Sequence, residues 1–301
     1  MLGVRLFSFV YSGKRVKRYL ICIYKTLLTL MRANPKIVFA QNPSLILNYL
    51  LIIARIFFRY QLVSDAHYAG VIAYNGNGLM QKALDLSNKL VDLVIVTNAD
   101  HAEYIHNIGG KAVICEDPLP DIMKYNAHED DSGKTVFYIC SYDIDEPYDL
   151  AFKAARVLSR DNFKFLVSGN YKKANINPDD YPHITFLGYL PEAEYYTQFF
   201  QSNIILDLTD NENCLLCGAY EAMAAQRPLV VSDTLCLRSY FTKGTIFAKH
   251  DVNSIVNAVI QAYRERATLK IGISAWRESI YDHQNIRILN INRALGLPEN
   301  S

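Results

Sequence analysis

Acidic residues are absent from the first 64 positions of this 301-residue chain. That segment holds ten of the 31 lysines and arginines, which leaves 21 bases against 30 acids in the remainder. The formal net charge of +1 therefore combines a basic first segment with an acidic remainder. Such asymmetry predicts an anionic partner for the first segment, either a membrane surface or a nucleic acid.

Zinc-finger spacings and RNA-binding aromatic motifs are also absent, so we expect no nucleic acid. The basic residues at 14–32 stand instead among apolar ones such as Tyr19, Ile23 and Leu27. This pattern fits a helix at a lipid interface, which makes a membrane surface one expected partner. It fits equally well a helix that packs its apolar side on a sheet and leaves its bases in water.

Long apolar runs are missing as well. The most hydrophobic run, Leu45 to Phe58, is interrupted by Asn48 and Arg55 and is shorter than the roughly 18 residues of a membrane span. The segment from Met1 to Val10 lacks the apolar core of a signal peptide. We therefore expect a cytoplasmic protein, peripheral on the inner face of the membrane if the basic segment binds lipid.

Cysteines are scattered, at positions 22, 115, 140, 214, 217 and 236, and in a cytoplasmic protein they stay reduced. Cys214 and Cys217 form a C-x-x-C at a predicted helix start, but no second pair completes a zinc site. The D-x-D pattern of Asp143 and Asp145 precedes another helix start, where acids are favoured in any case. We expect no metal, no cofactor and thiols that shape a loop, with a redox-active pair as the alternative.

Short apolar runs alternate with helix-like segments along the whole chain. The predicted strands lie near 4–10, 36–40, 61–64, 92–96, 111–115, 135–140, 163–167, 184–187, 203–208, 229–231 and 245–248. The predicted helices lie near 15–33, 43–58, 78–90, 99–108, 147–160, 191–201, 216–226, 252–267 and 271–293. Such alternation predicts an α/β fold in which helices cover both faces of parallel sheets.

A polar, turn-rich stretch at 116–133 separates two such arrays. Since half of the residues are hydrophobic, the chain can form two cores of ordinary size. We expect two doubly wound Rossmann-like domains with a cleft between them. The first would span 1–120 and the second 134–270, and 271–301 would form a C-terminal helix that can cross back to the first domain.

Residues 211–233 carry the most specific pattern, N-E-N-C-L-L-C-G-A-Y-E-A-M-A-A-Q-R-P-L-V-V-S-D. A strand that ends at Asp207 leads through this polar loop into a helix of small residues, which Pro228 ends before the next strand. A helix N-terminus after such a loop attracts phosphate, because its backbone N–H groups and its dipole favour anions. Glu221, one turn inside the helix, suits sugar hydroxyls beside that phosphate, so the pattern indicates a nucleotide-sugar.

The segment E-A-M-A-A-Q-R-P-L-V-V-S-D, residues 221–233, resembles the signature of GT-B glycosyltransferases of family 4. The resemblance continues through 237–241 and 244–247, which are similar to the family's next strand and loop. It covers 134–270 closely and the shortened first domain loosely. It implies a GT-B fold, a nucleotide-sugar on the second domain, an acceptor on the first, retention of anomeric configuration and no metal in the chemistry.

In that family two glutamates eight residues apart contact the donor. The resemblance assigns ribose binding to Glu221, whereas the first position holds Asn213, which can bind a hydroxyl but carries no charge. The turn before the helix would hold the diphosphate on its backbone N–H groups. This turn comprises Cys214, Leu215, Leu216, Cys217 and Gly218.

The family's usual G-R…K-G element is absent after the strand at 135–140, so the cation for the diphosphate must come from elsewhere. The resemblance offers Lys172 or Lys173, after a turn at Gly169, and Arg238, while Ser232 ends a strand beside the same pocket. The lysines fit surface residues without a function equally well.

In the first domain, Ser64-Asp65-Ala66-His67 resembles the family's D-A-H element. The resemblance implies that His67 lies near the donor sugar, where it can stabilise developing charge or position the acceptor. Asp65 would orient the loop or bind an acceptor hydroxyl. Both residues also fit a loop held by hydrogen bonds.

The sequence therefore predicts a glycosyltransferase that moves a sugar from a nucleotide-sugar to a glycan or lipid-linked acceptor in polysaccharide or glycolipid synthesis. Alternatives are a subunit that needs a partner chain for activity, a nucleotide-sugar-binding regulator, and a GT-B fold nucleotide-sugar epimerase. The epimerase would need acid–base carboxylates near His67.

Overall fold

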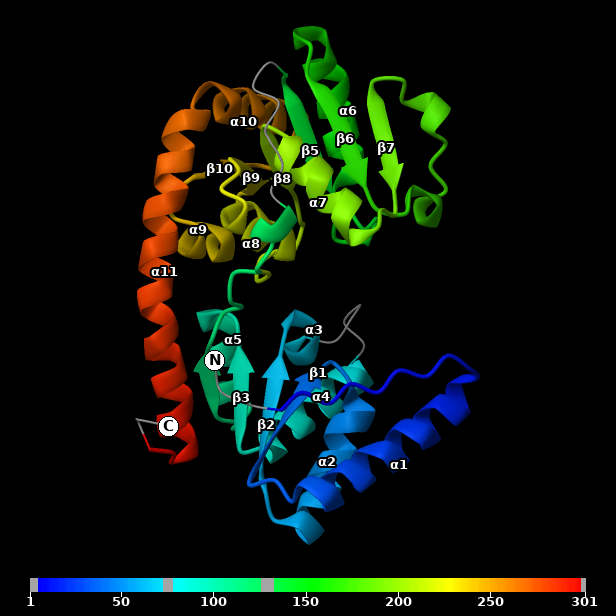
Figure 1. Cartoon of the computed structure of the whole chain (residues 1–301), viewed down its shortest axis with the longest axis vertical. Coiled ribbons are helices and arrows are strands. Elements are labelled where there is room, and N and C mark those ends of the chain that lie inside the picture. Colours follow the sequence, from blue (N-terminus) through cyan, green and yellow to red (C-terminus); the bar gives the residue numbers. More distant parts are fainter. Residues whose placement is uncertain (1–4, 73–77, 126–132, 299–301) are drawn as a thin grey trace. The chain divides into compact units, whose positions relative to one another are not determined.

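The computed structural model describes residues 5–72, 78–125 and 133–298. It divides into two compact units: unit 1 comprises Met1–Asp117 and His283–Ser301, and unit 2 comprises Pro118–Asp282. Each unit is built on one parallel sheet (Figure 1). Residues 126–132 of the expected linker lie outside the described part of the chain.

Unit 1 has a four-stranded sheet in the order β1-β2-β3-β4. Its strands are β1 (Ile37–Asn42), β2 (Gln61–Ala66), β3 (Leu93–Val96) and β4 (Ala112–Ile114). Its helices are α1 (Arg15–Ala33), α2 (Leu45–Phe58), α3 (Tyr68–Val71), α4 (Gly78–Leu90), α5 (Ala99–Asn107) and the last part of α11 (Arg266–Leu295). Successive strand residues face opposite sides, so Leu62 joins the core formed with α2 and α5 whereas Val63 packs with Ile291 and Leu295 of α11.

Unit 2 has a six-stranded sheet in the order β10-β9-β8-β5-β6-β7. Its strands are β5 (Thr135–Ile139), β6 (Lys164–Ser168), β7 (Ile184–Gly188), β8 (Ile204–Asp207), β9 (Leu229–Ser232) and β10 (Thr245–Ala248). Its helices are α6 (Tyr148–Leu158), α7 (Glu192–Gln201), α8 (Cys217–Ala224), α9 (Leu235–Tyr240), α10 (Val252–Arg264) and the first part of α11, with 3₁₀ turns at Met123–Tyr125, Ser159–Asp161, Tyr171–Ala174 and Pro178–Asp180.

The two faces of the unit 2 sheet carry separate cores. Tyr138 and Leu206 face the side covered by α6 and α10, whereas Phe137 and Ile205 face the side covered by α7 and α8. Trp276 of α11 is buried in the second core and donates its indole N–H to the Tyr240 carbonyl oxygen at 2.8 Å. These fully buried strands explain why the sequence shows continuous apolar runs there.

Two sequence-based expectations about elements are wrong. The expected strand at 4–10 is not a strand over its described residues 5–10, where Leu6 and Val10 are 89% and 86% exposed and so have no core to pack on. Residues 237–241 were expected to continue into a strand and loop, but they belong mostly to α9. The Thr234 hydroxyl accepts the Leu237 N–H at 3.2 Å and caps that helix.

Candidate functional site

The loops that follow the strands of unit 2 form the candidate site. All paired strands of this sheet are parallel, so their carboxyl ends lie at one edge. The chain order reverses between β5 and β8, which are neighbours in the sheet but far apart in sequence. Ligands of open α/β sheets bind outside the carboxyl ends at such a reversal.

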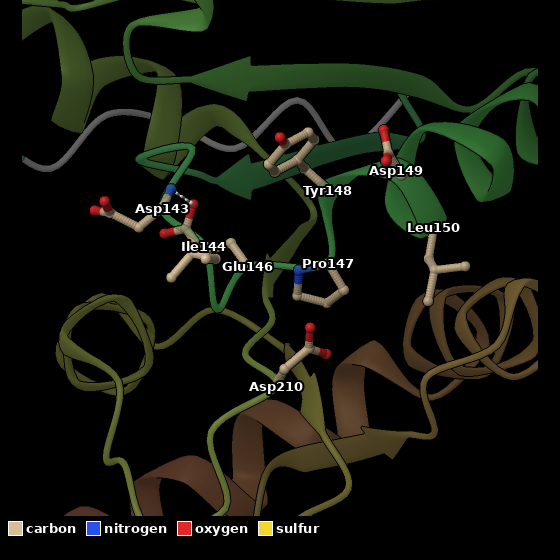
Figure 2. Close-up of a pocket in the computed structure, with 8 residues that line it drawn as sticks. All are labelled: Asp143, Ile144, Glu146, Pro147, Tyr148, Asp149, Leu150 and Asp210. Atoms are coloured by element: carbon tan, nitrogen blue, oxygen red, sulfur yellow. Dashed lines mark hydrogen bonds between the residues drawn. The ribbon is translucent and has the colours of Figure 1, made fainter. Parts of the chain in front are cut away.

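A pocket of about 340 Å³ lies at this reversal (Figure 2). Its lining comes from the loop after β5, the first turn of α6 and the loop after β8. The lining residues are Asp143, Ile144, Glu146, Pro147, Tyr148, Asp149, Leu150 and Asp210. Four of them are carboxylates, so the pocket favours hydroxyl donors such as a sugar over a phosphate group.

Glu146 organises the loop after β5. Its carboxylate accepts the Ser141 N–H and hydroxyl, each at 2.8 Å, and the Asp143 N–H at 3.3 Å. Lys173 then donates its ammonium group to Asp143, which lowers the pKa of that carboxyl group from its usual value. The loop after β5 is therefore folded around carboxylates.

The start of α8 packs tightly on the end of β8. A Cβ atom on Gly218 would lie 2.5 Å from Oδ2 of Asp207 and 2.3 Å from Cδ1 of Ile139, so only glycine lets the helix approach this far. Asp207 is buried, and burial raises the pKa of its carboxyl group well above its usual value, although a hydrogen bond from the Ala219 N–H opposes this. Gly218 of the motif thus has a packing role, because it lets α8 lie close to the sheet.

Glu221 is held by two tyrosines of α7. The hydroxyl of Tyr195 donates to its Oε2 at 2.8 Å, and the hydroxyl of Tyr196 donates to its Oε1 at 2.9 Å. Burial raises the pKa of Glu221, while the two tyrosine hydrogen bonds lower it. Each carboxylate oxygen can accept more than one hydrogen bond, so the orientation is set and capacity for a ligand hydroxyl remains.

The turn before α8 presents backbone rather than side chains. Leu215 and Leu216 pack against the second core of unit 2, and Leu216 stands at the N-cap of α8 without a side-chain oxygen to accept hydrogen bonds. Cys214 is half-buried, and its desolvation raises its pKa to about 12 and disfavours the thiolate that redox chemistry requires. Asn213 is half-buried and Cys217 is exposed in the same turn.

The Gly169 turn depends on glycine. Its φ is +85°, and a Cβ atom there would lie 1.9 Å from the Cys140 carbonyl oxygen. The 3₁₀ turn that follows carries Lys172 and Lys173, both exposed. Lys173 reaches the loop after β5 through Asp143, so this predicted diphosphate cation already has a carboxylate partner.

Ser232 and Arg238, on the far side of the reversal, are also engaged. Arg238 forms an ion pair with Asp233 and stacks over the Phe247 ring at 4.5 Å. The buried Ser232 hydroxyl accepts the Thr209 N–H at 2.9 Å and lies 3.0 Å from Nε2 of His250. Ser232 therefore links neighbouring loops in the structure.

His250 is a site residue that sequence reasoning missed. It follows β10 by two residues, and its Nδ1 lies 3.2 Å from Oδ1 of Asp210 at the pocket. It thus links the loop after β8, the last residue of β9 and the loop after β10. Its position directly after a strand was the available signal, since that is where ligand-binding side chains gather in parallel sheets.

In unit 1 the structure brings Asp65 and His67 to the carboxyl end of β2 and adds Asp117. Nδ1 of His67 lies 3.8 Å from Oδ2 of Asp117, and His67 is also the N-cap of α3. Burial raises the pKa of Asp65, the imidazole of His67 lowers it, and Asp117 raises it. Asp117 was missed because it follows β4 in the segment predicted to be a linker.

The D-x-D carboxylates have partners within the protein. Asp143 pairs with Lys173, and Oδ2 of Asp145 accepts the Thr209 hydroxyl at 3.3 Å. Among the described residues, no group of three or more histidine, cysteine or acidic side chains could hold a metal ion.

Comparisons with known proteins identify the fold. No protein-family model matches the chain, and no curated protein sequence matches it significantly. Among solved structures, sucrose-phosphate synthase of Thermosynechococcus elongatus is similar with a TM-score of 0.74 and 15% identity over 96% of this chain and 80% of that one. HepE of Anabaena in complex with UDP-glucose has a TM-score of 0.70 and 13% identity over 96% and 84%.

A putative UDP-N-acetylglucosamine 2-epimerase of Listeria monocytogenes is also similar, with a TM-score of 0.55 and 12% identity over 87% of this chain and 74% of that one. At such identities a likeness establishes the fold. The chain therefore has the α/β GT-B fold with two Rossmann-like parallel sheets, which confirms the predicted fold class.

Proposed function

We propose that the protein is a glycosyltransferase that moves a sugar from a nucleotide-sugar donor to a glycan or lipid-linked acceptor. The proposal rests on the position of Glu221, one turn inside α8, where Tyr195 and Tyr196 orient its carboxylate. A carboxylate fixed in this way can bind vicinal ribose hydroxyls with little loss of side-chain entropy on binding. The turn at 214–218 would offer its backbone N–H groups to the diphosphate.

The comparisons support the choice of donor. HepE is a GT-B structure in complex with UDP-glucose, and it covers nearly the whole of this chain. Because Lys173 and Arg238 each have a carboxylate partner, we propose that the exposed Lys172 contributes to neutralising the leaving diphosphate. Asn213 would bind a donor-sugar hydroxyl as a neutral group.

The acceptor side is proposed to lie at Asp65, His67 and Asp117 of unit 1. A histidine beside two carboxylates can position an acceptor hydroxyl and stabilise charge in the transition state. Retention of anomeric configuration, metal-independent chemistry and a role in polysaccharide or glycolipid synthesis at the inner face of the membrane complete the proposal.

Release of nucleoside diphosphate tests the donor. The purified protein is incubated with UDP-, GDP-, ADP- and dTDP-sugars, with and without membrane lipid extract as an acceptor source. We expect release from one nucleotide class, faster with acceptor, unaffected by EDTA and lost in Glu221→Gln. A regulator would bind the donor without turnover, and a subunit would become active only with a partner chain.

The epimerase is the second candidate, because the Listeria structure shares the fold. Asp65 and Asp117 near His67 are carboxylates of the kind that an epimerase needs. Chromatography of the donor after incubation without acceptor separates the two functions. A donor recovered as its epimer would replace the transferase proposal, whereas a donor hydrolysed to free sugar and nucleoside diphosphate supports it.

A further inference from the structure

Helix α1 is only partly covered in unit 1. Of its 19 residues only Leu30 is buried, although the helix packs beside α2 (Figure 1). Val16, Leu20, Tyr24 and Met31 are 72%, 63%, 66% and 61% exposed. They are spaced by four, four and seven residues, so they lie along one side of the helix and form what we call the α1 stripe.

Basic residues share the exposed surface of α1 with the α1 stripe. Exposed bases on or next to the helix are Lys14, Arg15, Lys17, Arg18, Lys25 and Arg32. The guanidinium groups of Arg15 and Arg18 lie 5.9 and 5.5 Å from the centre of the Tyr19 ring. No acid occurs within the first 64 residues to neutralise these charges locally.

The neighbouring helix α2 repeats the pattern. Ile53, Ile56 and Phe57 are 58%, 72% and 76% exposed near its carboxyl end, and Arg59 beside them is also exposed. Large aliphatic and aromatic side chains on adjacent helices are not usual on a surface that meets only water. A partner that is both apolar and anionic would complement the exposed apolar side chains and the exposed bases at once.

We propose that the α1 stripe docks on an anionic lipid surface, with its apolar side chains in the headgroup boundary and its bases on lipid phosphates. Such a surface satisfies the apolar and the cationic groups at once. A second copy of this chain would place like charges against each other, and nucleic acid would leave the apolar stripe unused. None of the helices in the described part of the chain has the length and hydropathy of a membrane span.

The docking surface lies on unit 1. Its role in bringing a transferase to a lipid-linked acceptor rests on the proposed function, whereas lipid binding itself does not. Vesicle flotation of the full chain tests it with phosphatidylcholine alone and with an equal mixture of phosphatidylcholine and phosphatidylglycerol. We expect flotation with the mixture only, and loss of flotation at high salt because surface charges are screened.

Two variants separate the contribution of the bases to lipid binding from that of the apolar side chains. Replacing Lys17, Lys25 and Arg32 by glutamine should weaken partitioning about 100-fold, since each base near an anionic surface contributes roughly fivefold. The matched control replaces the exposed Lys82, Lys89 and Lys111 of the same unit by glutamine and should bind like the wild type. Leu20→Ser with Met31→Ser, which keeps every base, should also reduce binding.

Equal loss in the control triple, or no flotation of the wild type, would overturn the docking surface. So would a stable dimer in sedimentation that Leu20→Ser dissociates, because a second copy would then cover the stripe. Circular dichroism of each variant excludes unfolding as the cause. The melting temperature of the same proteins with nucleotide-sugars measures donor binding separately. Vesicle binding without any shift of the melting temperature would reject the proposed function and leave the docking surface in place.

Discussion

Replacing Glu221 by glutamine isolates the proposed ribose contact. Hydrogen bonds to a charged group contribute about 1.5–3 kcal/mol, so Glu221→Gln should weaken nucleotide binding roughly 10- to 150-fold. Calorimetric titration with UDP, GDP, ADP and dTDP in turn measures this loss for whichever nucleotide the wild type binds. Glutamine is preferable to alanine, because it fills the same volume beside the two tyrosines.

The same substitution also disturbs the protein itself, and a control is needed. Tyr195→Phe removes one hydrogen bond to Glu221 but leaves the carboxylate in place. Both variants should lower the free energy of unfolding by about 1–3 kcal/mol. Only Glu221→Gln should lose nucleotide affinity by tenfold or more at neutral pH. Equal affinities for Glu221→Gln and the wild type, or an equal loss in Tyr195→Phe, would refute the contact.

The pH dependence gives a second check on Glu221. Its pKa is raised by burial, and the two tyrosines oppose that rise. Nucleotide affinity should therefore fall as the pH decreases through the pKa of Glu221, because a protonated carboxyl group is a weaker acceptor. Removal of the Tyr195 hydroxyl raises the pKa further, so the fall should begin at higher pH in Tyr195→Phe. Superimposable profiles would contradict this.

Three further predictions follow from unit 2 and unit 1. Gly169→Ala should lower the free energy of unfolding by at least about 2 kcal/mol, because φ is +85° and the new Cβ atom would meet the Cys140 carbonyl oxygen. Gly188→Ala, at φ +70° in open space, should lower it by about 1 kcal/mol, and urea unfolding measures both. The raised pKa of Asp207 means that the folded state binds the proton of this carboxyl group more tightly than the unfolded state does, so the melting temperature should fall as the pH rises through the folded pKa. Asp207→Asn should flatten that part of the curve of melting temperature against pH. Identical slopes for the variant and the wild type would contradict the burial argument. His67→Ala should reduce kcat about 100-fold with the donor's dissociation constant unchanged, and a loss confined to donor binding would move His67 out of the transfer step.

Much of the fold could be predicted because local patterns agree with it. The helix at 78–90 and the strand at 245–248 were expected at the bounds that α4 and β10 have. In both, the apolar spacing and the flanking turn residues carry the information within one segment. The strand predicted at 4–10 does not form over residues 5–10, because a strand also needs a neighbouring strand to pair with and local sequence does not encode that pairing.

Contacts between distant segments could not be predicted. The sequence marks Tyr195 and Tyr196 only as residues of a helix, yet they hold Glu221 from 26 and 25 residues away, respectively. His250 and Asp210 meet because parallel strands end at one edge of the sheet. Motifs therefore indicated the site, whereas the groups that orient it became visible only in the folded chain.

The most direct test of the central claim is thermal melting with a panel of UDP-, GDP-, ADP- and dTDP-sugars, wild type beside Glu221→Gln. A ligand at 100 times its dissociation constant stabilises by about 2.7 kcal/mol, or roughly 5–10 °C for a unit of this size. We predict such a shift with one nucleotide class and its loss in the variant. No shift of the wild type with any nucleotide-sugar, although both proteins melt cooperatively, would contradict a donor site in unit 2.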